Sequence, residues 1–179
     1  MRDNNYYLMR KDVPVCEFNI NRPKSKGNVR SVEMISVLEK RLPIEMQKGM
    51  DLGHFLRERL KPIFRRHIGK KIITNGGYLT DNLENIIEYT GAFSLIDDFW
   101  LKQTDDDGKS WAAYNLFDNE FDEQVSLLAF TKKGTYEADG FIRSPEFTTD
   151  GMVGKAWRKI NGVIYLYKAE LGWMRHHGG

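Results

Sequence analysis

The dipeptide Asn161-Gly162 restricts the fold of this chain more than any other local feature. It separates two short stretches, residues 156–160 and 163–168, that are rich in aromatic and β-branched side chains. An Asn-Gly pair suits the two consecutive positive φ angles of a type I′ turn, which joins neighbouring antiparallel strands. We therefore predict a two-stranded hairpin here. Three apolar side chains are expected to share one face of it: Trp157, Ile164 and Leu166.

The N-terminal part of the chain also carries strand patterns. Residues 6–9 and 13–20 are short aromatic or β-branched stretches separated by a polar turn, which predicts a second hairpin. Residues 21–28 are a loop by composition, and residues 29–38 predict a third strand. Residues 42–44 should be extended, because the residue before a proline avoids the helical region.

Helical spacing begins at Asp51, whose carboxylate can cap free amide groups. Pro62 should end or kink this helix. Its apolar stripe has four members: Leu52, Phe55, Leu56 and Leu60. A further turn is expected within residues 63–68, and Gly76-Gly77 marks a flexible break.

Two more helices are predicted farther along the chain. One covers residues 80–89, with Thr80 as its cap and with three side chains pointing inward: Leu83, Ile86 and Ile87. The other covers residues 122–130, and its inward side chains are Val125, Leu128 and either Leu127 or Ala129. A short strand at residues 99–101 and a turn at residues 105–109 lie between them.

These elements together predict an α+β fold with an N-terminal antiparallel β portion, two to three central helices and a C-terminal hairpin. The chain of 179 residues can bury a core within one domain. Approximate subdomains are expected at residues 1–50 (β-rich), 51–130 (mainly helical) and 131–179 (loop, hairpin and tail).

Composition excludes several classes of protein. Hydrophobic residues make up 41% of the chain and no apolar run approaches the length of a membrane span. The N-terminus lacks the apolar core of a signal peptide. The single cysteine, Cys16, rules out an internal disulfide framework and favours a reducing compartment, the cytoplasm of a bacterial host. We expect Cys16 to be a small strand residue.

Charge is segregated, although the net charge is only +2. Residues 57–71 carry seven basic and one acidic side chain, a net charge of +6. Residues 81–123 carry two basic and twelve acidic side chains, a net charge of −10. Such a polarised field favours charged partners.

Four segments resemble the nucleotide-binding lobe of HipA-like serine/threonine kinases, in particular the divergent kinases of Gram-positive gut bacteria and their mobile elements. These segments are YYLM…VPVCEFNI at the N-terminus, FWLKQ around Trp100, NLFDNEFDEQVSLLAF at residues 115–130 and SPEFTTDG at residues 144–151. The resemblance implies a loop that cradles phosphate and a lysine that contacts it. The matching positions here are Thr148, Thr149, Gly151 and Lys168.

The family's catalytic aspartate, magnesium-binding aspartate and helical lobe have no counterpart in these residues. We therefore expect a protein that is not an enzyme and needs no cofactor, and whose phosphate site is vestigial. A catalytically incomplete kinase fragment, acting as a toxin–antitoxin component or a nucleotide-binding subunit, stays open as an alternative.

The acidic stretch suggests a surface that binds a protein partner. Aromatic side chains lie among the acids, and aromatic anchors in a charged surface are typical of interaction hot spots. The alternative is that these aromatics belong to the core. The predicted partner-binding acids are Asp97, Asp98, Asp105, Asp106, Asp107, Asp118 and Glu120.

A small, charge-polarised protein resembling mobile-element proteins is similar to an anti-CRISPR inhibitor. We expect such a protein to block a type II RNA-guided nuclease or its guide-RNA complex, because the guide–target channel of that nuclease is strongly basic. The acidic residues would occupy the surface that DNA otherwise uses.

The basic stretch offers a third reading, a nucleic-acid-binding regulator. Clustered arginines and lysines can contact phosphate backbones, although the same pattern fits the solvated face of a helix. The residues concerned are Arg57, Arg59, Arg65, Arg66, Lys70 and Lys71.

No metal site is expected. The run Asp105-Asp106-Asp107 lacks the alternate spacing and the distant glutamate of a calcium loop. The four histidines lack the paired cysteines of a zinc site: His54, His67, His176 and His177.

Overall fold

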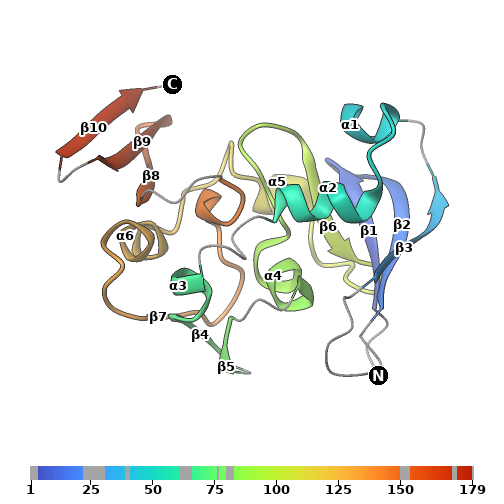
Figure 1. Cartoon of the computed structure of the whole chain (residues 1–179), viewed down its shortest axis with the longest axis horizontal. Helices are drawn as coiled ribbons and strands as arrows, with labels where there is room; N and C mark the ends of the chain where they lie inside the picture. The colour runs from blue at the N-terminus through green and yellow to red at the C-terminus, as the bar shows by residue number, and fades with distance from the viewer. Residues whose placement is uncertain are drawn as a thin grey trace.

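A four-stranded antiparallel sheet occupies one end of the molecule in the computed structural model (Figure 1). The order is β3 (Ser31–Val37), β2 (Val13–Asn21), β1 (Asn5–Arg10) and β6 (Phe99–Gln103). The structure describes residues 4–21, 31–38, 41–60, 66–75, 77–79, 83–149, 154–170 and 173–178. The predicted loop at residues 21–28 lies almost wholly outside them.

The N-terminal hairpin and third strand are confirmed, and β6 joins them from the middle of the chain. Leu8 of β1 pairs with Cys16 of β2 on one side and with Leu101 of β6 on the other. These three side chains are buried, as are Tyr6 and Phe18, whose rings stack at 5.6 Å. The sequence predicts the strand at residues 99–101 but not its place beside β1.

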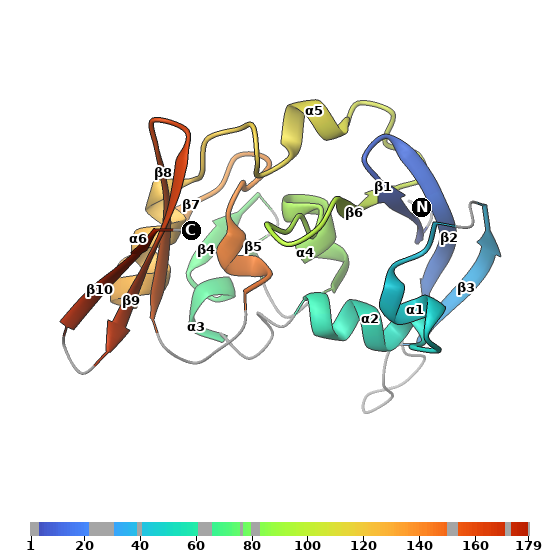
Figure 2. The same ribbon diagram turned by 90° about the horizontal axis from the view of Figure 1, so that it is seen from above.

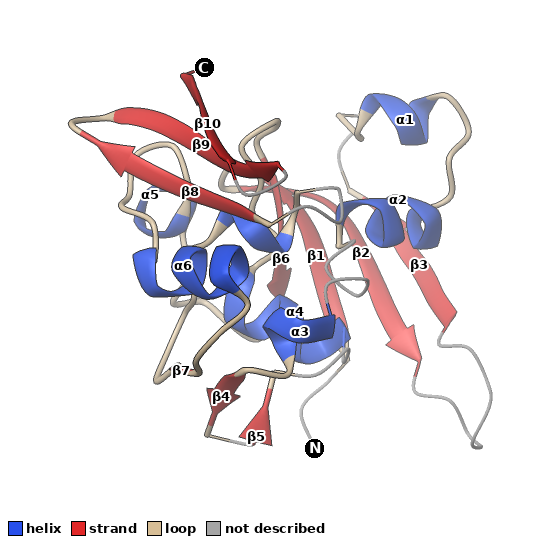
Figure 3. Ribbon diagram, turned by 60° about the vertical axis from the view of Figure 1, so that its left-hand side comes forward, coloured by secondary structure: helices blue, strands red, loops and turns tan. Residues whose placement is uncertain are grey.

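Helix α2 (Leu52–Arg59) covers this sheet on the side of β3 (Figure 3). Asp51 caps it as predicted, since its carboxylate accepts a hydrogen bond from the His54 amide at 2.8 Å. The helix ends at Arg59, before Pro62, which lies outside the described residues. Four predicted stripe residues are buried in the same core: Leu52, Phe55, Leu56 and Leu60.

Helix α1 (Ile44–Gln47) corrects the prediction of an extended stretch at residues 42–44. Pro43 is extended, with φ −48° and ψ 143°, but Ile44 starts the helix. The restriction before a proline acts on the preceding residue, Leu42, whereas a proline itself readily precedes a helical turn.

Helices α4 (Leu83–Thr90) and α6 (Glu123–Thr131) match the two central helices predicted. Asp122 caps α6, accepting a hydrogen bond from the Val125 amide at 3.3 Å. Ala129 is buried and Leu127 is exposed, which settles the two alternatives for that face. Thr80, the predicted cap of the other helix, lies outside the described residues.

A small second sheet was not predicted. It has the order β5 (Gly77–Tyr78), β4 (Ile72–Thr74) and β7 (Tyr136–Glu137), and β4 pairs with β7 in parallel. Of the expected break at Gly76-Gly77, Gly77 begins β5 with a φ of +111°, and Gly76 lies outside the described residues. Strands this short carry too few residues to show a periodic pattern. Helix α3 (Arg66–Gly69) precedes this sheet and contacts α6.

The C-terminal hairpin is confirmed in position and in turn type. Strands β8 (Lys155–Ile160) and β9 (Val163–Glu170) flank Asn161 and Gly162, whose φ angles are +51° and +78°. The register pairs Trp157 with Leu166, and Lys159 with Ile164, so the three predicted apolar side chains share a face. The expected tail instead adds a third strand, β10 (Trp173–Gly178), to this sheet (Figure 2).

Three hydrophobic clusters hold these elements together. One lies under the N-terminal sheet, a second joins α3, α6 and the small sheet, and a third is aromatic and lies between the two ends of the molecule. Trp157 and Ile164 of the C-terminal sheet pack against the aromatic cluster, which includes Phe93 and Trp100. Among the helices that the structure describes, none has the length and apolar character needed to cross a membrane.

Candidate functional site

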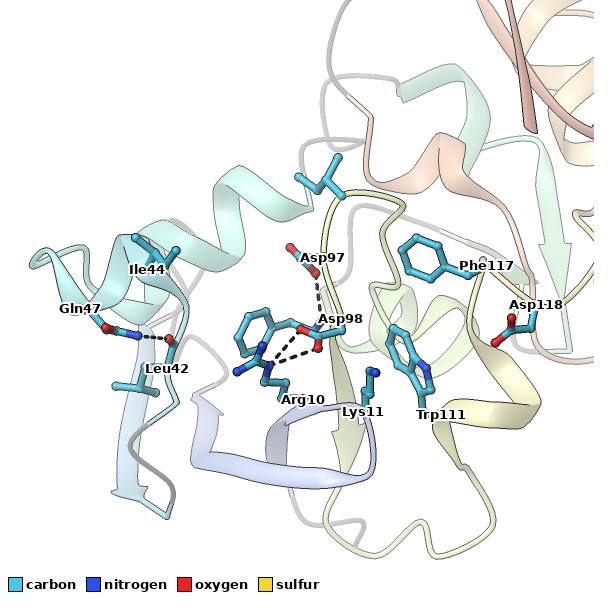
Figure 4. Close-up of a pocket in the computed structure, with 12 residues that line it drawn as sticks. Arg10, Lys11, Leu42, Ile44, Gln47, Asp97, Asp98, Trp111, Phe117 and Asp118 are labelled. Carbon is cyan, nitrogen blue, oxygen red and sulfur yellow. Dashed lines mark hydrogen bonds and ion pairs between the residues drawn. The ribbon is translucent and has the colours of Figure 1, made fainter. Parts of the chain in front are cut away.

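A cleft of about 710 Å³ opens where β1, α1, β6 and α5 (Trp111–Tyr114) approach one another (Figure 4). We call it the β1–β6 cleft. Figure 4 shows Arg10, Lys11 and Asp98 in its middle, α1 on one side, and Trp111 with Phe117 on the other. The two walls and the middle of the cleft come from segments far apart in the sequence, so the site exists only in the folded protein.

Ion pairing holds the middle of the cleft. Arg10 Nε lies 3.1 Å from Oδ1 and 3.2 Å from Oδ2 of Asp98, and its guanidinium also lies 5.7 Å from the Phe99 ring centroid. The Lys11 amide donates to the Asp98 carbonyl at 2.9 Å. The β1–β2 turn and the start of β6 are therefore fixed to each other.

The far wall is tied to the same turn. The Trp111 amide donates to the Asp12 carboxylate at 2.8 Å, and the Trp111 and Phe117 rings lie 6.1 Å apart. Asp118 completes this wall and accepts a hydrogen bond from the Asn115 side chain at 3.0 Å.

Three large apolar side chains around the cleft are exposed to solvent. Ile96 is 88% exposed, Ile44 is 63% exposed and Phe117 is 40% exposed. Exposed apolar groups that gather around a concavity with polar neighbours mark interaction surfaces, whereas single exposed ones are ordinary. The sequence analysis missed Ile44, Ile96 and Arg10. An isoleucine directly before two aspartates, at residues 96–98, is a local signal for Ile96, but it does not indicate Ile44 or Arg10.

Arg59 corrects part of the predicted nucleic-acid surface. It is only 8% exposed, and its guanidinium forms two hydrogen bonds of 2.6 and 2.8 Å with Asp97. It also donates to the Ala92 carbonyl at 2.9 Å and to the Phe99 carbonyl. The Arg59 side chain, at the end of α2, points toward the loop before β6 and bonds to it. It is therefore unavailable to a phosphate backbone.

The other basic residues differ in exposure and contacts. Arg57 and Lys70 are exposed, whereas the Lys71 ammonium donates to the Lys132 carbonyl. Arg65 and the side chain of Arg66 lie outside the described residues. Within the described residues, the charged groups of Arg59 and Lys71 are therefore engaged by the protein itself.

The predicted acidic surface is divided in two. Asp97 and Asp98 precede β6, whereas residues 105–107 follow its far end. At about 3.3 Å per residue, the five residues of β6 separate the two groups by roughly 16 Å. Asp98 and Asp118 line the same cleft, and four of the predicted acids are exposed: Asp105, Asp107, Asp118 and Glu120. Asp106 instead pairs with Lys109 at 3.0 Å.

The aromatic residues among these acids belong mainly to the core, which corrects their reading as surface anchors. Phe93 and Trp100 stack at 4.8 Å and are buried, and Phe99 and Phe121 are buried too. Among the described aromatic residues of the acidic stretch, Phe117 alone is exposed, and Trp111 and Tyr114 are half-buried.

The first half of the SPEFTTDG segment is a buried structural turn. Ser144 and Glu146 flank the start of a short 3₁₀ helix (η2, Pro145–Phe147), and both are buried. Glu146 Oε1 accepts the Trp157 amide at 2.8 Å and lies 2.7 Å from Ser126 Oγ, and Oε2 accepts from Ser144. This carboxyl satisfies the open edge of β8, as a neighbouring strand would.

Burial raises the pKa of Glu146, and its hydrogen bonds with Ser144, Ser126 and the Trp157 amide lower the pKa by a smaller amount. Ser126 Oγ also lies 2.8 Å from the Trp157 carbonyl oxygen. A hydroxyl has one proton to donate, so Ser126 cannot serve both acceptors. A proton on Glu146, donated to Ser126, would free the Ser126 proton for Trp157, which agrees with the raised pKa.

The predicted phosphate-binding residues are placed in different surroundings. Thr148 and Thr149 line a second cleft together with residues of α1 and α2, and Thr148 donates to the Pro145 carbonyl at 3.3 Å. Lys168 lies opposite Lys155 in β8 and opposite Arg175 in β10. Gly151 lies outside the described residues.

Cys16 is buried, and burial raises its pKa to about 11, with a smaller opposing effect from a backbone hydrogen bond at Leu8. Its thiol is therefore protonated at neutral pH. Within the described ranges, no group of three or more His, Cys, Asp or Glu side chains is arranged to hold a metal ion.

Comparison with protein-family models, with curated proteins and with solved structures finds no match to this chain. The site must therefore be interpreted from its own geometry.

Proposed function

We propose that this chain acts by binding another protein, without chemistry of its own, through the β1–β6 cleft. One observation carries the proposal: Ile44, Ile96 and Phe117 are exposed around a cleft of about 710 Å³ whose centre is a fixed ion pair. At protein interfaces, most of the binding energy comes from a few apolar anchor residues that are surrounded by polar ones. The Arg10–Asp98 pair gives this surface a fixed shape before a partner arrives.

The partner that the acidic residues suit is a cationic protein surface. The exposed carboxylates Asp105, Asp107, Asp118 and Glu120 favour approach to such a surface. Together with the resemblance to mobile-element proteins, they support an anti-CRISPR role against a type II RNA-guided nuclease, whose guide–target channel is positively charged. Asp97 and Asp98 have a different part in this proposal, because they hold Arg59 and Arg10.

A DNA-cleavage assay tests this role. A purified type II nuclease loaded with guide RNA is titrated with the chain, and the concentration giving half inhibition is measured. Charge reversal of the four exposed acids should raise that concentration at least tenfold. The control reverses Glu33 and Glu137, two exposed acids far from both acidic groups in sequence. Equal losses in the two variants, or no inhibition by the wild type, would contradict the proposed role.

Nucleotide binding is a second candidate, favoured by one feature of the C-terminal sheet. Lys155 and Lys168 occupy directly opposed register positions on neighbouring strands. A phosphate bound beside them would meet the ammonium groups of both lysines. Isothermal titration with ATP and Mg²⁺ should then detect binding that Lys168→Ala abolishes. Undetectable binding, or binding indifferent to Lys168→Ala, would remove this candidate.

A further inference from the structure

A smaller cleft, of about 270 Å³, adjoins the β1–β6 cleft at the turn that joins β1 to β2. We call it the turn cleft. The two clefts share Arg10, Lys11 and Asp98, so one bound segment can extend from one into the other. The volume of the turn cleft lies just below the range of about 300–1,000 Å³ typical of pockets for whole small molecules, so it suits a single side chain. The remaining lining residues are Val13, Val15 and Arg41.

The charges that line the turn cleft are mostly positive. Three basic side chains, those of Arg10, Lys11 and Arg41, lie beside the single carboxylate of Asp98, which gives a net charge of +2. Lys11 and Arg41 are exposed. Within the residues that the structure describes, neither the Lys11 ammonium nor the Arg41 guanidinium has a hydrogen bond or an ion pair. Two cations are therefore available to an anionic group.

Asp98 balances the charge of Arg10 but uses few of its hydrogen-bond donors. Both carboxylate oxygens of Asp98 accept from Nε alone, at 3.1 and 3.2 Å (Figure 4). An arginine side chain has five N–H groups, so the four on its terminal nitrogens have no acceptor in the described part of the chain. The Arg10 side chain is 42% exposed. Its terminal nitrogens are therefore open to a second carboxylate, with which arginine forms paired hydrogen bonds.

The backbone that carries Lys11 is fixed on both sides. Its amide donates to the Asp98 carbonyl at 2.9 Å, and its carbonyl accepts a hydrogen bond from the Trp100 indole nitrogen at 2.6 Å. The turn is therefore held in one conformation before a ligand arrives. Such preorganisation lowers the entropic cost of binding.

The surroundings of the turn cleft favour an acidic protein segment over a nucleic acid. The adjoining β1–β6 cleft has exposed apolar groups at Ile44 and Ile96, and the exposed carboxylate of Asp118 lines it as well. A nucleic acid carries a negative charge at every phosphate and would bring some of these charges toward Asp118. A peptide with one carboxylate beside an apolar residue instead places each group on a surface of matching character.

We infer that the turn cleft binds a glutamate or aspartate side chain of the partner protein, next to an apolar residue that enters the β1–β6 cleft. Lys11, Arg41 and the terminal nitrogens of Arg10 receive the carboxylate. This inference rests on the proposed protein-binding function. It adds a local acidic contact to the cationic partner surface that the exposed acids of this chain favour.

A nuclear magnetic resonance titration of the ¹⁵N-labelled chain tests the inference. The probe is acetyl-Gly-Leu-Glu-Leu-Gly-amide, whose blocked ends leave the glutamate as its one charge, and the comparison peptide has glutamine in its place. We expect the amide signals of Lys11 and Arg41 to shift with the glutamate peptide, and the glutamine peptide to bind at least fivefold more weakly. Equal affinities, or no shift at these residues, would overturn the inference. Tighter binding of a uridylate pentanucleotide at the same residues would assign the cations to nucleic acid and also overturn it.

Matched variants locate the binding. Lys11→Gln with Arg41→Gln should weaken binding of the glutamate peptide at least fivefold. The control, Arg57→Gln with Lys133→Gln, removes the same two charges at exposed positions outside both clefts. Equal loss in the control would show a general charge effect and overturn the inference. Unchanged melting temperatures confirm that each variant is folded.

A further variant separates this inference from the proposed function. Asp105→Lys with Asp107→Lys changes two exposed acids that line neither cleft. It should impair nuclease inhibition and leave peptide binding unchanged. No peptide binding by a wild-type chain that still inhibits the nuclease would overturn the turn-cleft inference alone. Peptide binding without inhibition would support the inference and overturn the nuclease as partner.

Discussion

Arg59 and Asp97 form a two-pronged ion pair, with Nη1–Oδ2 and Nη2–Oδ1 distances of 2.6 and 2.8 Å. The same aspartate accepts the Phe99 amide at 3.0 Å, so it links the end of α2 to the start of β6. Ile96, the most exposed apolar side chain at the β1–β6 cleft, is the neighbouring residue. The pair therefore fixes the loop on which the candidate contact surface depends.

Replacing Arg59 with alanine should destabilise the protein by about 3–5 kcal/mol, because removal of one partner leaves a partly buried charge without compensation. Urea denaturation followed by circular dichroism measures this loss. Arg57→Ala is the control, because Arg57 is exposed on the same helix and should change stability by no more than about 0.5 kcal/mol. Similar losses in the two variants would show that the ion pair contributes little.

Glu146 should make stability depend on pH. Its pKa is raised above the ordinary value of 4.5, so the folded state keeps a proton that the unfolded state releases. The stabilisation from this proton is fully present below pH 4.5 and is lost as the pH rises through the folded-state pKa. Glu146→Gln should remove this dependence and match or exceed wild-type stability at pH 7. Denaturation curves at pH 5 and 7 measure it, and an unaltered pH dependence in the variant would contradict the assignment.

Glu146→Ala should behave differently from the glutamine variant. It leaves the Trp157 amide and the Ser144 hydroxyl without their acceptor and the Ser126 oxygen without its donor, at about 1–3 kcal/mol for each buried group that stays unpaired. We expect a loss of about 2–4 kcal/mol, visible in the same denaturation curves. A stability equal to that of the glutamine variant would show that these hydrogen bonds do not close the edge of β8.

Gly154 should not tolerate a side chain. A Cβ atom there would lie 2.9 Å from the Phe130 carbonyl oxygen, which belongs to the backbone of α6 and cannot rotate away. Gly154→Ala should therefore cost about 1–3 kcal/mol through forced backbone shifts. Gly140→Ala is the matched control, because a Cβ there has no neighbour within 4 Å. Thermal melting of both variants decides whether β8 packs on α6 this closely.

Cys16 should resist thiol reagents while the protein is folded. Its side chain is buried and its pKa is raised to about 11, so both access and thiolate content are low near neutral pH. Labelling with a chromogenic disulfide at pH 8 should be slow in buffer and fast in urea. Rapid labelling of the folded chain would contradict the placement of Cys16 between β1 and β3.

The sequence predicts those elements whose signals are local. The Asn161-Gly162 turn fixes its hairpin, and the Asp51 and Asp122 carboxylates fix the starts of α2 and α6. Each of these signals acts within about four residues, so tertiary packing does not alter the structure that it predicts. The short strands β4, β5 and β7 have no such signal, because long-range pairing alone defines them.

The candidate site was less accessible to sequence reasoning for the same reason. Charge counting treats Asp97 and Asp105 as one surface, but β6 separates them, and Asp97 pairs with an arginine 38 residues away. Likewise, the sequence suggests that Arg59 lies on the exposed face of a helix, but in the structure α2 packs against the loop before β6 and buries it. Pairings across such sequence distances have no local signature.

The most direct test of the account measures the affinity of the chain for a guide-loaded type II nuclease by biolayer interferometry. Ile96→Ser with Phe117→Ser removes two exposed anchors of the β1–β6 cleft and should weaken binding at least tenfold, equivalent to about 1.4 kcal/mol. Val13→Ser with Leu127→Ser is the control, since both residues are exposed outside that cleft. Wild-type affinity in the control with loss in the cleft variant is the predicted result. Unchanged affinity in the cleft variant, or no binding by the wild type, would contradict it.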